Sequence, residues 1–386
     1  MFASEMNALF RLLAAVALVC TVVVATAQTQ QTKKPLHIVG KTGFDSGRVF
    51  LLPFAGSTYY AGSVAKEYKL KRGGAFEFND SIAYPTAFLI GVRVGTDWKY
   101  MSNVFFTESG EQYISCKDNR VTPSIENETM REYIDEYLPR FDRVNKDLDN
   151  LYDLKDSMVK RFHQKIPPSV QADWDDKMSD IARKEDLILL KFTQKHPKSF
   201  IPLWKMAEML PGGYKSIFDS VYSTLDNSVK YTFTGQRFKT NLENVRRLDI
   251  GKKFPQLQAY NAKQQKAYTP DFAHLGKYTL VHFWLSSSYP SIRQFPAWID
   301  LYKHYHDSCS FDILSISVDD KSFSETWTKT IAEYHPQWQQ FIDWDKKIAE
   351  TYCIDFCPVN FLLDEKGFIL KRNITPQEME QILKNR

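Results

Sequence analysis

The segment from Tyr278 to Pro296 constrains the fold most, because a buried strand there leads directly into a helix start. Thr279–Leu285 is a short run of apolar, β-branched and aromatic residues, which predicts a buried strand. Three serines follow, and Pro290 stands where the first turn of a helix tolerates a residue without an N–H group. Such a turn presents backbone N–H groups and the positive end of the helix dipole. It is therefore the first place to look for a reactive side chain.

The same segment, F-W-L-S-S-S-Y-P-S-I-R-Q-F-P, resembles the active-site segment of thioredoxin-like proteins of the bacterial envelope. This group includes thiol-disulfide oxidoreductases and relatives of the peroxiredoxins. The family usually reads F-W-A-S-W-C-x-P-C, followed by a helix and a proline. The positions that match are Phe283, Trp284, Ser286, Pro290 and Pro296. The resemblance implies a thioredoxin-like α/β fold for residues 251–386.

Both cysteines of the family motif are absent, because Ser288 and Ser291 hold their positions. In the family, the helix N-terminus acidifies the first thiol, which attacks disulfides as a thiolate. A serine hydroxyl neither ionises at neutral pH nor forms a disulfide. Ser287 and Tyr289 also differ from the usual Trp and Gly, which favours natural divergence over an engineered replacement. The resemblance thus implies the frame of the site without its usual redox centre.

The rest of this part follows the element order of that fold. Apolar runs predict strands at Phe311–Val318, Val359–Asp364 and Phe368–Arg372. Periodic apolar positions and cap residues predict helices at Ile292–Tyr305, Ser322–Glu333, Ile348–Tyr352 and Thr375–Lys384. The sequence that begins Cys357-Pro358-Val359 aligns with the proline loop of the family, where the proline is cis and faces the active-site turn. The resemblance implies a binding groove at Trp284, Tyr289, Pro290 and Pro358.

Cysteines outside the missing motif leave a redox alternative open. The resemblance places Cys357 beside the turn at Ser288, where a helix N-terminus would make its thiol more acidic than usual. Cys353 or Cys309 would then resolve or pair with it. The other interpretation makes these residues small apolar fillers or a structural disulfide. No cysteine or histidine spacing indicates a metal site, and no motif indicates a cofactor.

Residues 34–120 alternate short strands with turn signals, which predicts an antiparallel β-sandwich or barrel. Predicted strands are Leu36–Lys41, Arg48–Phe54, Ala65–Leu70, Ala75–Phe78, Thr86–Val94, Lys99–Phe106 and Gln112–Cys116. Residues 121–250 change to a helical pattern. Predicted helices are Ile125–Arg161, Val170–Lys195, Phe200–Leu210, Ile217–Leu225 and Phe238–Leu248. We therefore expect a multidomain chain with a β-sandwich, a central helical segment and a C-terminal α/β domain.

Residues 1–27 predict a signal peptide, with Arg11 before an apolar run and Ala25-Thr26-Ala27 as a small-x-small cleavage site. We expect export to the periplasm or cell envelope. Cys20 leaves a lipoprotein open, and an uncleaved membrane anchor is a further alternative. The formal net charge of +4 is too small to argue for a nucleic-acid partner.

Two functions are consistent with these features. In the first, the C-terminal domain is a redox-silent module that holds a protein or peptide partner beside Pro358 by backbone hydrogen bonds. In the second, it is a thiol-disulfide oxidoreductase that uses Cys357 with Cys353 or Cys309. The loss of both motif cysteines favours the first.

Overall fold

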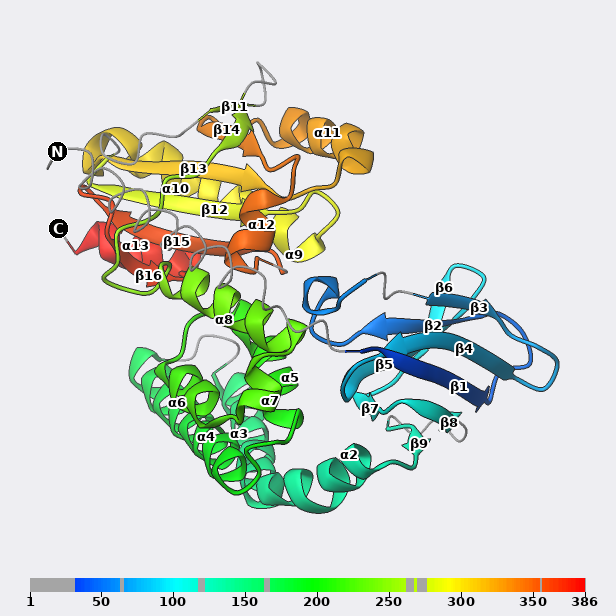
Figure 1. The fold of residues 1–386 in the computed structure, drawn as a ribbon. Coiled ribbons are helices and arrows are strands. Elements are labelled where there is room, and N and C mark those ends of the chain that lie inside the picture. Colours follow the sequence, from blue (N-terminus) through cyan, green and yellow to red (C-terminus); the bar gives the residue numbers. More distant parts are fainter. Residues whose placement is uncertain are drawn as a thin grey trace, which may run out of the picture.

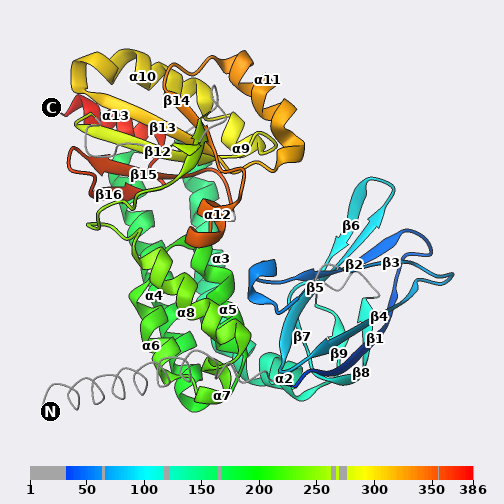
Figure 2. The ribbon, with the colours of Figure 1, turned by 45° about the horizontal axis from the view of Figure 1, so that its top comes forward.

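The computed structural model describes residues 32–62, 66–116, 122–162, 167–261, 267–268, 276–354 and 356–385. A β-rich part, a helical part and an α/β part follow one another along the chain, and the helical part lies between the other two (Figures 1 and 2). The predicted signal peptide, residues 1–27, lies outside the described residues. Among the described residues, no helix has the length and apolar character needed to cross a membrane.

The β-rich part contains two sheets. Its strands are β1 (Lys34–Thr42), β2 (Arg48–Pro53), β3 (Lys66–Lys69), β4 (Ala75–Ile82), β5 (Thr86–Val94), β6 (Asp97–Met101), β7 (Phe105–Thr107), β8 (Gly110–Cys116) and β9 (Ser124–Ile125), with a short 3-10 turn at Ser57–Tyr59. One sheet has the order β4-β1-β8-β9. The other has the order β3-β2-β5-β6, and β7 also pairs with β5. The face-to-face packing of a sandwich stays a prediction.

Two details of the β-rich part differ from the sequence prediction. The pairing is not antiparallel throughout, because β1 and β8 are parallel, with Leu36 opposite Gly110. The chain passes through the other sheet between these strands, and such a long connection allows β8 to return in the direction of β1. The predicted strand Lys99–Phe106 is two strands, β6 and β7. They separate where Ser102 Oγ accepts a hydrogen bond from Ile90 N at 2.8 Å, which ends the regular pairing.

The helical part contains α2 (Glu128–Arg131), a π-helix (Glu132–Tyr137), a 3-10 turn (Leu138–Phe141), α3 (Asp142–Arg161), α4 (Pro168–Lys195), α5 (Ile201–Met209), a 3-10 turn (Leu210–Gly212), α6 (Ser216–Thr224), α7 (Asn227–Lys230) and α8 (Phe233–Arg246). The prediction of one continuous helix over Ile125–Arg161 is wrong. Pro139 has no N–H group for the bond an α-helix needs there. Leu138 N instead donates to Tyr133 O, five residues back, and a 3-10 turn follows.

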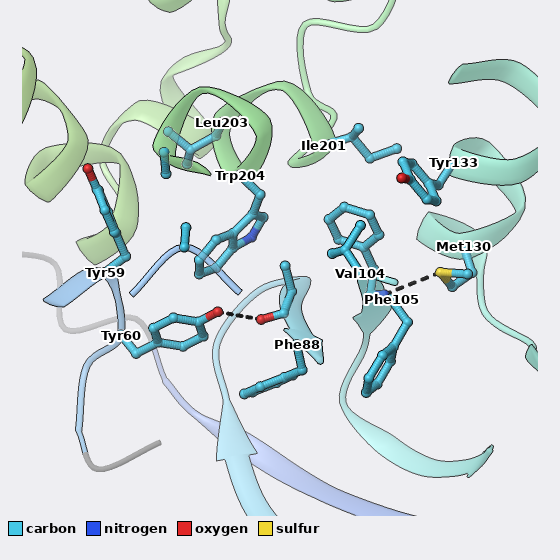
Figure 3. Packing of buried hydrophobic residues seen from close by; sticks show 14 of the residues in the cluster. Tyr59, Tyr60, Phe88, Val104, Phe105, Met130, Tyr133, Ile201, Leu203 and Trp204 are labelled. Carbon is cyan, nitrogen blue, oxygen red and sulfur yellow. Dashed lines mark hydrogen bonds between the residues drawn. The ribbon is translucent and has the colours of Figure 1, made fainter. Parts of the chain in front are cut away.

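The β-rich part and the helical part share one hydrophobic core. Phe88 and Phe105 of the strands and Trp204 of α5 are buried in the same cluster (Figure 3). Hydrogen bonds cross the boundary: Trp204 Nε1 donates to Pro85 O at 3.1 Å, and Thr234 Oγ1 donates to Tyr59 O at 2.7 Å. Burial of large aromatic side chains from both sides makes separation of these parts costly.

The α/β part is built on a seven-stranded sheet with the order β11-β10-β14-β13-β12-β15-β16. Its elements are β10 (Ala259–Asn261), β11 (Ala267–Tyr268), β12 (Tyr278–Trp284), α9 (Tyr289–Ile292), α10 (Phe295–Cys309), β13 (Phe311–Ser317), a 3-10 turn (Lys321–Phe323), α11 (Ser324–Tyr334), β14 (Gln339–Ile342), α12 (Lys347–Tyr352), β15 (Val359–Asp364), β16 (Ile369–Arg372) and α13 (Pro376–Lys384). Strand β14 was not predicted from the sequence, because two of its four residues, Gln339 and Gln340, are polar.

Every residue of β12 is buried, as predicted for a central strand covered on both faces. Leu280 and Trp284 pack with residues of α10 and α13 on one face. Val281 and Phe283 pack with residues of α12 on the other. Strands β12 and β13 are parallel, so the turns after both strands open at the same edge of the sheet.

The α/β part is joined to the helical part by Arg372 of β16. Its Nη2 donates to Pro211 O at 2.8 Å, and its guanidinium lies over the ring of Phe361. The backbone of Gly213 passes close to this guanidinium, so a Cβ at Gly213 would collide with it. Gly213 also has φ +122°, a conformation that side chains with a Cβ rarely adopt.

We therefore expect Gly213→Ala to destabilise the junction. The variant should lower the free energy of unfolding by roughly 1–3 kcal/mol, because strained backbone and a displaced Arg372 both cost energy. Urea unfolding followed by tryptophan fluorescence measures this. Gly212→Ala is the matched control, since a Cβ there meets no atom within 4 Å. Equal stability of the two variants would contradict the contact.

Candidate functional site

The serine turn joins β12 to α9 and lies against the proline loop. Ser288 is the N-cap residue of α9, and its main-chain oxygen accepts from Ile292 N at 3.0 Å. Its hydroxyl donates to Cys357 O at 3.2 Å. The peptide bond between Cys357 and Pro358 is cis. The structure thus confirms two expectations: the proline is cis, and its loop faces the turn.

Ser291 differs from Ser288 in accessibility. Ser291 is fully buried, and its hydroxyl accepts a hydrogen bond from Leu285 N at 3.4 Å, whereas Ser288 is partly exposed. Trp284 is also fully buried, with its ring edge on Phe295 at a centroid distance of 4.8 Å. The prediction that Trp284 lines the groove is therefore wrong. Its side chain belongs to the hydrophobic core of the α/β part, where it packs against Phe295.

A buried carboxylate that the sequence analysis did not assign to the site holds the turn in place. Asp319 follows β13 and is fully buried. It accepts from Ser286 N at 2.9 Å and 3.1 Å, from Ser286 Oγ at 3.0 Å, and from Ser317 Oγ at 2.6 Å. The neighbouring Asp320 has a different role, because it caps the next helical turn by accepting from Ser322 N at 3.0 Å. An acidic residue directly after a buried strand was the available signal.

Cys357 is not an acidic thiol. Burial and, to a lesser extent, the nearby Asp319 carboxylate raise its pKa to about 12, against a smaller opposing effect of Lys346. The prediction that the helix N-terminus lowers this pKa is therefore wrong. Desolvation disfavours the thiolate and is the largest cause of the raised pKa. At neutral pH the thiol is protonated and a poor nucleophile.

The structure does not bring Cys309 together with Cys357. In the parallel pair of β12 and β13, Tyr278 lies opposite Phe311 and Trp284 lies opposite Ser317. Cys309 precedes Phe311, whereas Ser288 and its partner Cys357 lie beyond Trp284. The two cysteines are thus a strand length apart, roughly 20 Å, against about 7 Å for the Cα atoms of a disulfide.

Cys353 and Cys357 belong to different hydrophobic clusters. Cys353 ends α12 with φ +52° and is buried in the cluster shared by the β-rich and helical parts. Cys357 packs against the cluster of the α/β sheet. In this arrangement the two thiols face different cores, although only three residues separate them in sequence.

Two aromatic side chains that adjoin the bonded turn and loop in sequence are exposed to solvent. Tyr289 follows Ser288 and is 75% exposed, and Phe356 precedes Cys357 and is 70% exposed. Pro290 is exposed and Pro358 is half-buried. An exposed pair of large rings beside a backbone contact is an arrangement that suits a protein ligand. We call Tyr289, Pro290, Phe356 and Pro358 the aromatic rim.

No cluster of three or more His, Cys, Asp or Glu residues suited to a metal ion occurs in the described part of the chain.

Comparison with known proteins finds relatives for part of the chain, although no family model matches. A thiol-disulfide oxidoreductase ResA of Bacillus cereus is 24% identical over 136 residues, 35% of this chain and 76% of that protein. The thioredoxin domain of a thiol-disulfide oxidoreductase from Bacteroides vulgatus is 26% identical, covers 36% of this chain and 96% of that domain, and has a TM-score of 0.32. A thioredoxin-like protein from Bacteroides caccae is 15% identical over 55% of this chain and 84% of its own, with a TM-score of 0.36. By the sequence match, part of this chain is homologous to the thioredoxin-like thiol-disulfide oxidoreductases.

Proposed function

We propose that the α/β part is a redox-silent binding module that holds an extended segment of a partner protein at the aromatic rim. The observation that carries this is the contact between Ser288 Oγ and Cys357 O. It keeps the turn and the cis-proline loop together at a position where the resemblance places a catalytic thiol. The frame for a bound chain is therefore retained, while the group that would attack a disulfide is a hydroxyl.

Two further observations support the binding function. The raised pKa of Cys357 leaves its thiol protonated at neutral pH, so it does not replace the missing nucleophile. Tyr289 and Phe356 are exposed beside the loop, where they would contact the side chains of a bound segment.

We also propose that the protein acts in the periplasm or cell envelope. This rests on residues 1–27, which lie outside the described residues and have the pattern of a signal peptide. The partner would then be another envelope protein. The β-rich and helical parts, joined by one core, would carry the binding module as a scaffold.

A binding assay with a defined probe tests the proposal. Reduced and alkylated insulin B chain, labelled with fluorescein, offers an extended peptide without free thiols. We expect fluorescence anisotropy to show binding that weakens roughly tenfold or more in Tyr289→Ser/Phe356→Ser, because burial of two aromatic rings contributes more than about 1.4 kcal/mol. Tyr113→Ser, at an exposed tyrosine of β8, is the matched control. Equal binding by all three proteins would refute the rim as the binding site.

The alternative function is that of a thiol-disulfide oxidoreductase centred on Cys357. The sequence similarity to such an enzyme supports this alternative. A thiol titration before and after mild reduction, run with an insulin-reduction assay, separates the two functions. We expect inert thiols and no insulin reduction. Reversible oxidation of Cys357 with turnover of insulin would overturn the binding-only function.

A further inference from the structure

A cleft of about 990 Å³ lies where the β-rich part meets the helical part, far along the chain from the serine turn. The turns at Tyr84-Pro85 and at Glu108 form one wall. The π-helix and the connection between α4 and α5, at His196-Pro197 and Phe200, form the others. A cleft of this volume has the size of a ligand site.

Hydrogen bonds between the walls fix the shape of the cleft. Thr129 donates from both N and Oγ1 to Glu108 Oε1, each at 2.7 Å. Tyr84 OH lies 3.0 Å from Thr234 Oγ1, and Trp204 Nε1 donates to Pro85 O at 3.1 Å. Because these bonds connect residues far apart in sequence, the cleft is formed before any ligand arrives, and binding does not have to order it.

The π-helix supplies one polar wall. Helices of this type are rare and occur frequently at functional sites. Glu132, Asp135 and Glu136 of this helix line the cleft. His196 lies between two of them, with Nδ1 3.2 Å from Glu132 Oε1 and Nε2 3.2 Å from Glu136 Oε2. Ser199 Oγ donates to Glu132 at 2.8 Å. Asp135 is exposed and lines the cleft, so its carboxylate can contact a ligand there.

The lining of the cleft carries charged side chains of both signs. Carboxylates and cationic side chains line the cleft in nearly equal numbers, so no net field selects an anion or a cation. Tyr84 and Phe200 add flat apolar surface. Their rings stack at a centroid distance of 5.2 Å and an interplanar angle of 4°. The β-rich part lines the cleft mainly with turns. Among the described lining residues, only Lys34, the first residue of β1, belongs to a strand of this part, so an extended peptide finds little backbone to pair with.

We propose that this cleft binds a neutral, hydroxyl-rich ligand, namely a segment of an oligosaccharide. Sugar hydroxyls donate to carboxylates such as Asp135 and accept from lysines such as Lys198, so one uncharged ligand satisfies both signs of the lining. The apolar face of a sugar ring fits against a flat surface such as that of Phe200. This site is separate from the aromatic rim and does not depend on the function proposed for it.

Isothermal titration of the full chain with maltohexaose, cellohexaose and chitohexaose tests the proposal. We expect at least one of them to bind, with affinity reduced roughly tenfold in Asp135→Asn and in Phe200→Leu, since loss of one good contact is about 1.4 kcal/mol. Asp153→Asn, on the exposed face of α3, should bind as the unmodified chain does. Asp135 lies on the surface, so this variant remains informative if Phe200→Leu fails to fold.

Three results would overturn the proposal: no binding of any of these sugars, binding that the cleft variants leave unchanged, or binding of the alkylated insulin B chain at this cleft in place of sugar. The rim variant Tyr289→Ser/Phe356→Ser should bind sugar normally, which keeps this test distinct from that of the binding module.

Discussion

The double variant Ser288→Cys/Ser291→Cys is expected to reduce insulin, whereas the unmodified chain is not. The substitutions place two thiols at the N-terminus of α9, one partly exposed and one buried, beside the cis-proline loop. Backbone N–H groups at a helix N-terminus lower a thiol pKa, which raises the share of reactive thiolate. We expect a turbidimetric rate roughly tenfold or more above that of the unmodified chain, because the thiolate is the attacking species.

A matched control distinguishes the effect of the site at the serine turn from the effect of the C-x-x-C spacing alone. Ser220 and Ser223 of α6 have the same separation in sequence, are exposed, and lie far from the turn. Ser220→Cys/Ser223→Cys therefore carries the same C-x-x-C pattern without the helix N-terminus or the proline loop. Similar rates for the two double variants, or inactivity of the first while it still forms its disulfide, would show that the frame of the turn no longer supports redox chemistry.

Acid is expected to destabilise the protein through His282, a fully buried residue of β12. Burial lowers its pKa from 6.5 to about 4. Its Nδ1 lies 3.3 Å from Ser315 Oγ, and its Nε2 has no hydrogen-bond partner among the described residues. The unfolded chain binds a proton near pH 6.5 and the folded chain does so only near pH 4. The free energy of unfolding therefore falls as pH falls through this window.

Replacing His282 by Phe should remove this acid sensitivity. Between about pH 7.5 and about pH 4, the unmodified chain should lose about 3 kcal/mol more than His282→Phe, which follows from about 1.36 kcal/mol per unit of pKa difference. Urea unfolding at several pH values measures both slopes, and any packing cost of Phe cancels in the comparison. His304→Gln, at an exposed histidine of α10, is the control. Identical slopes for the unmodified chain and His282→Phe would contradict a neutral, buried His282.

Local sequence determined the elements of the α/β part. The apolar runs that became β12, β13 and β15, and the capped periodic segments that became α10, α11 and α13, are close to the predicted ranges. Thr375 illustrates why, since its hydroxyl and Glu378 form a capping box that needs only neighbouring residues. The placement of Ser288 at a helix N-terminus was predictable for the same reason.

Tertiary structure decided what surrounds each group. Burial by residues distant in sequence explains three features of the site. These are the buried Asp319 network, the position of Trp284 in the core instead of the groove, and the raised pKa of Cys357. The parallel pairing of β1 with β8 and the separation of Cys309 from Cys357 depend on the order of strands in the sheets. The sequence by itself therefore determined the strand, the turn and the absence of the motif cysteines, because those rest on local chemistry. Only the tertiary structure decided which side chains are desolvated and which meet, because desolvation and contact are properties of the folded chain.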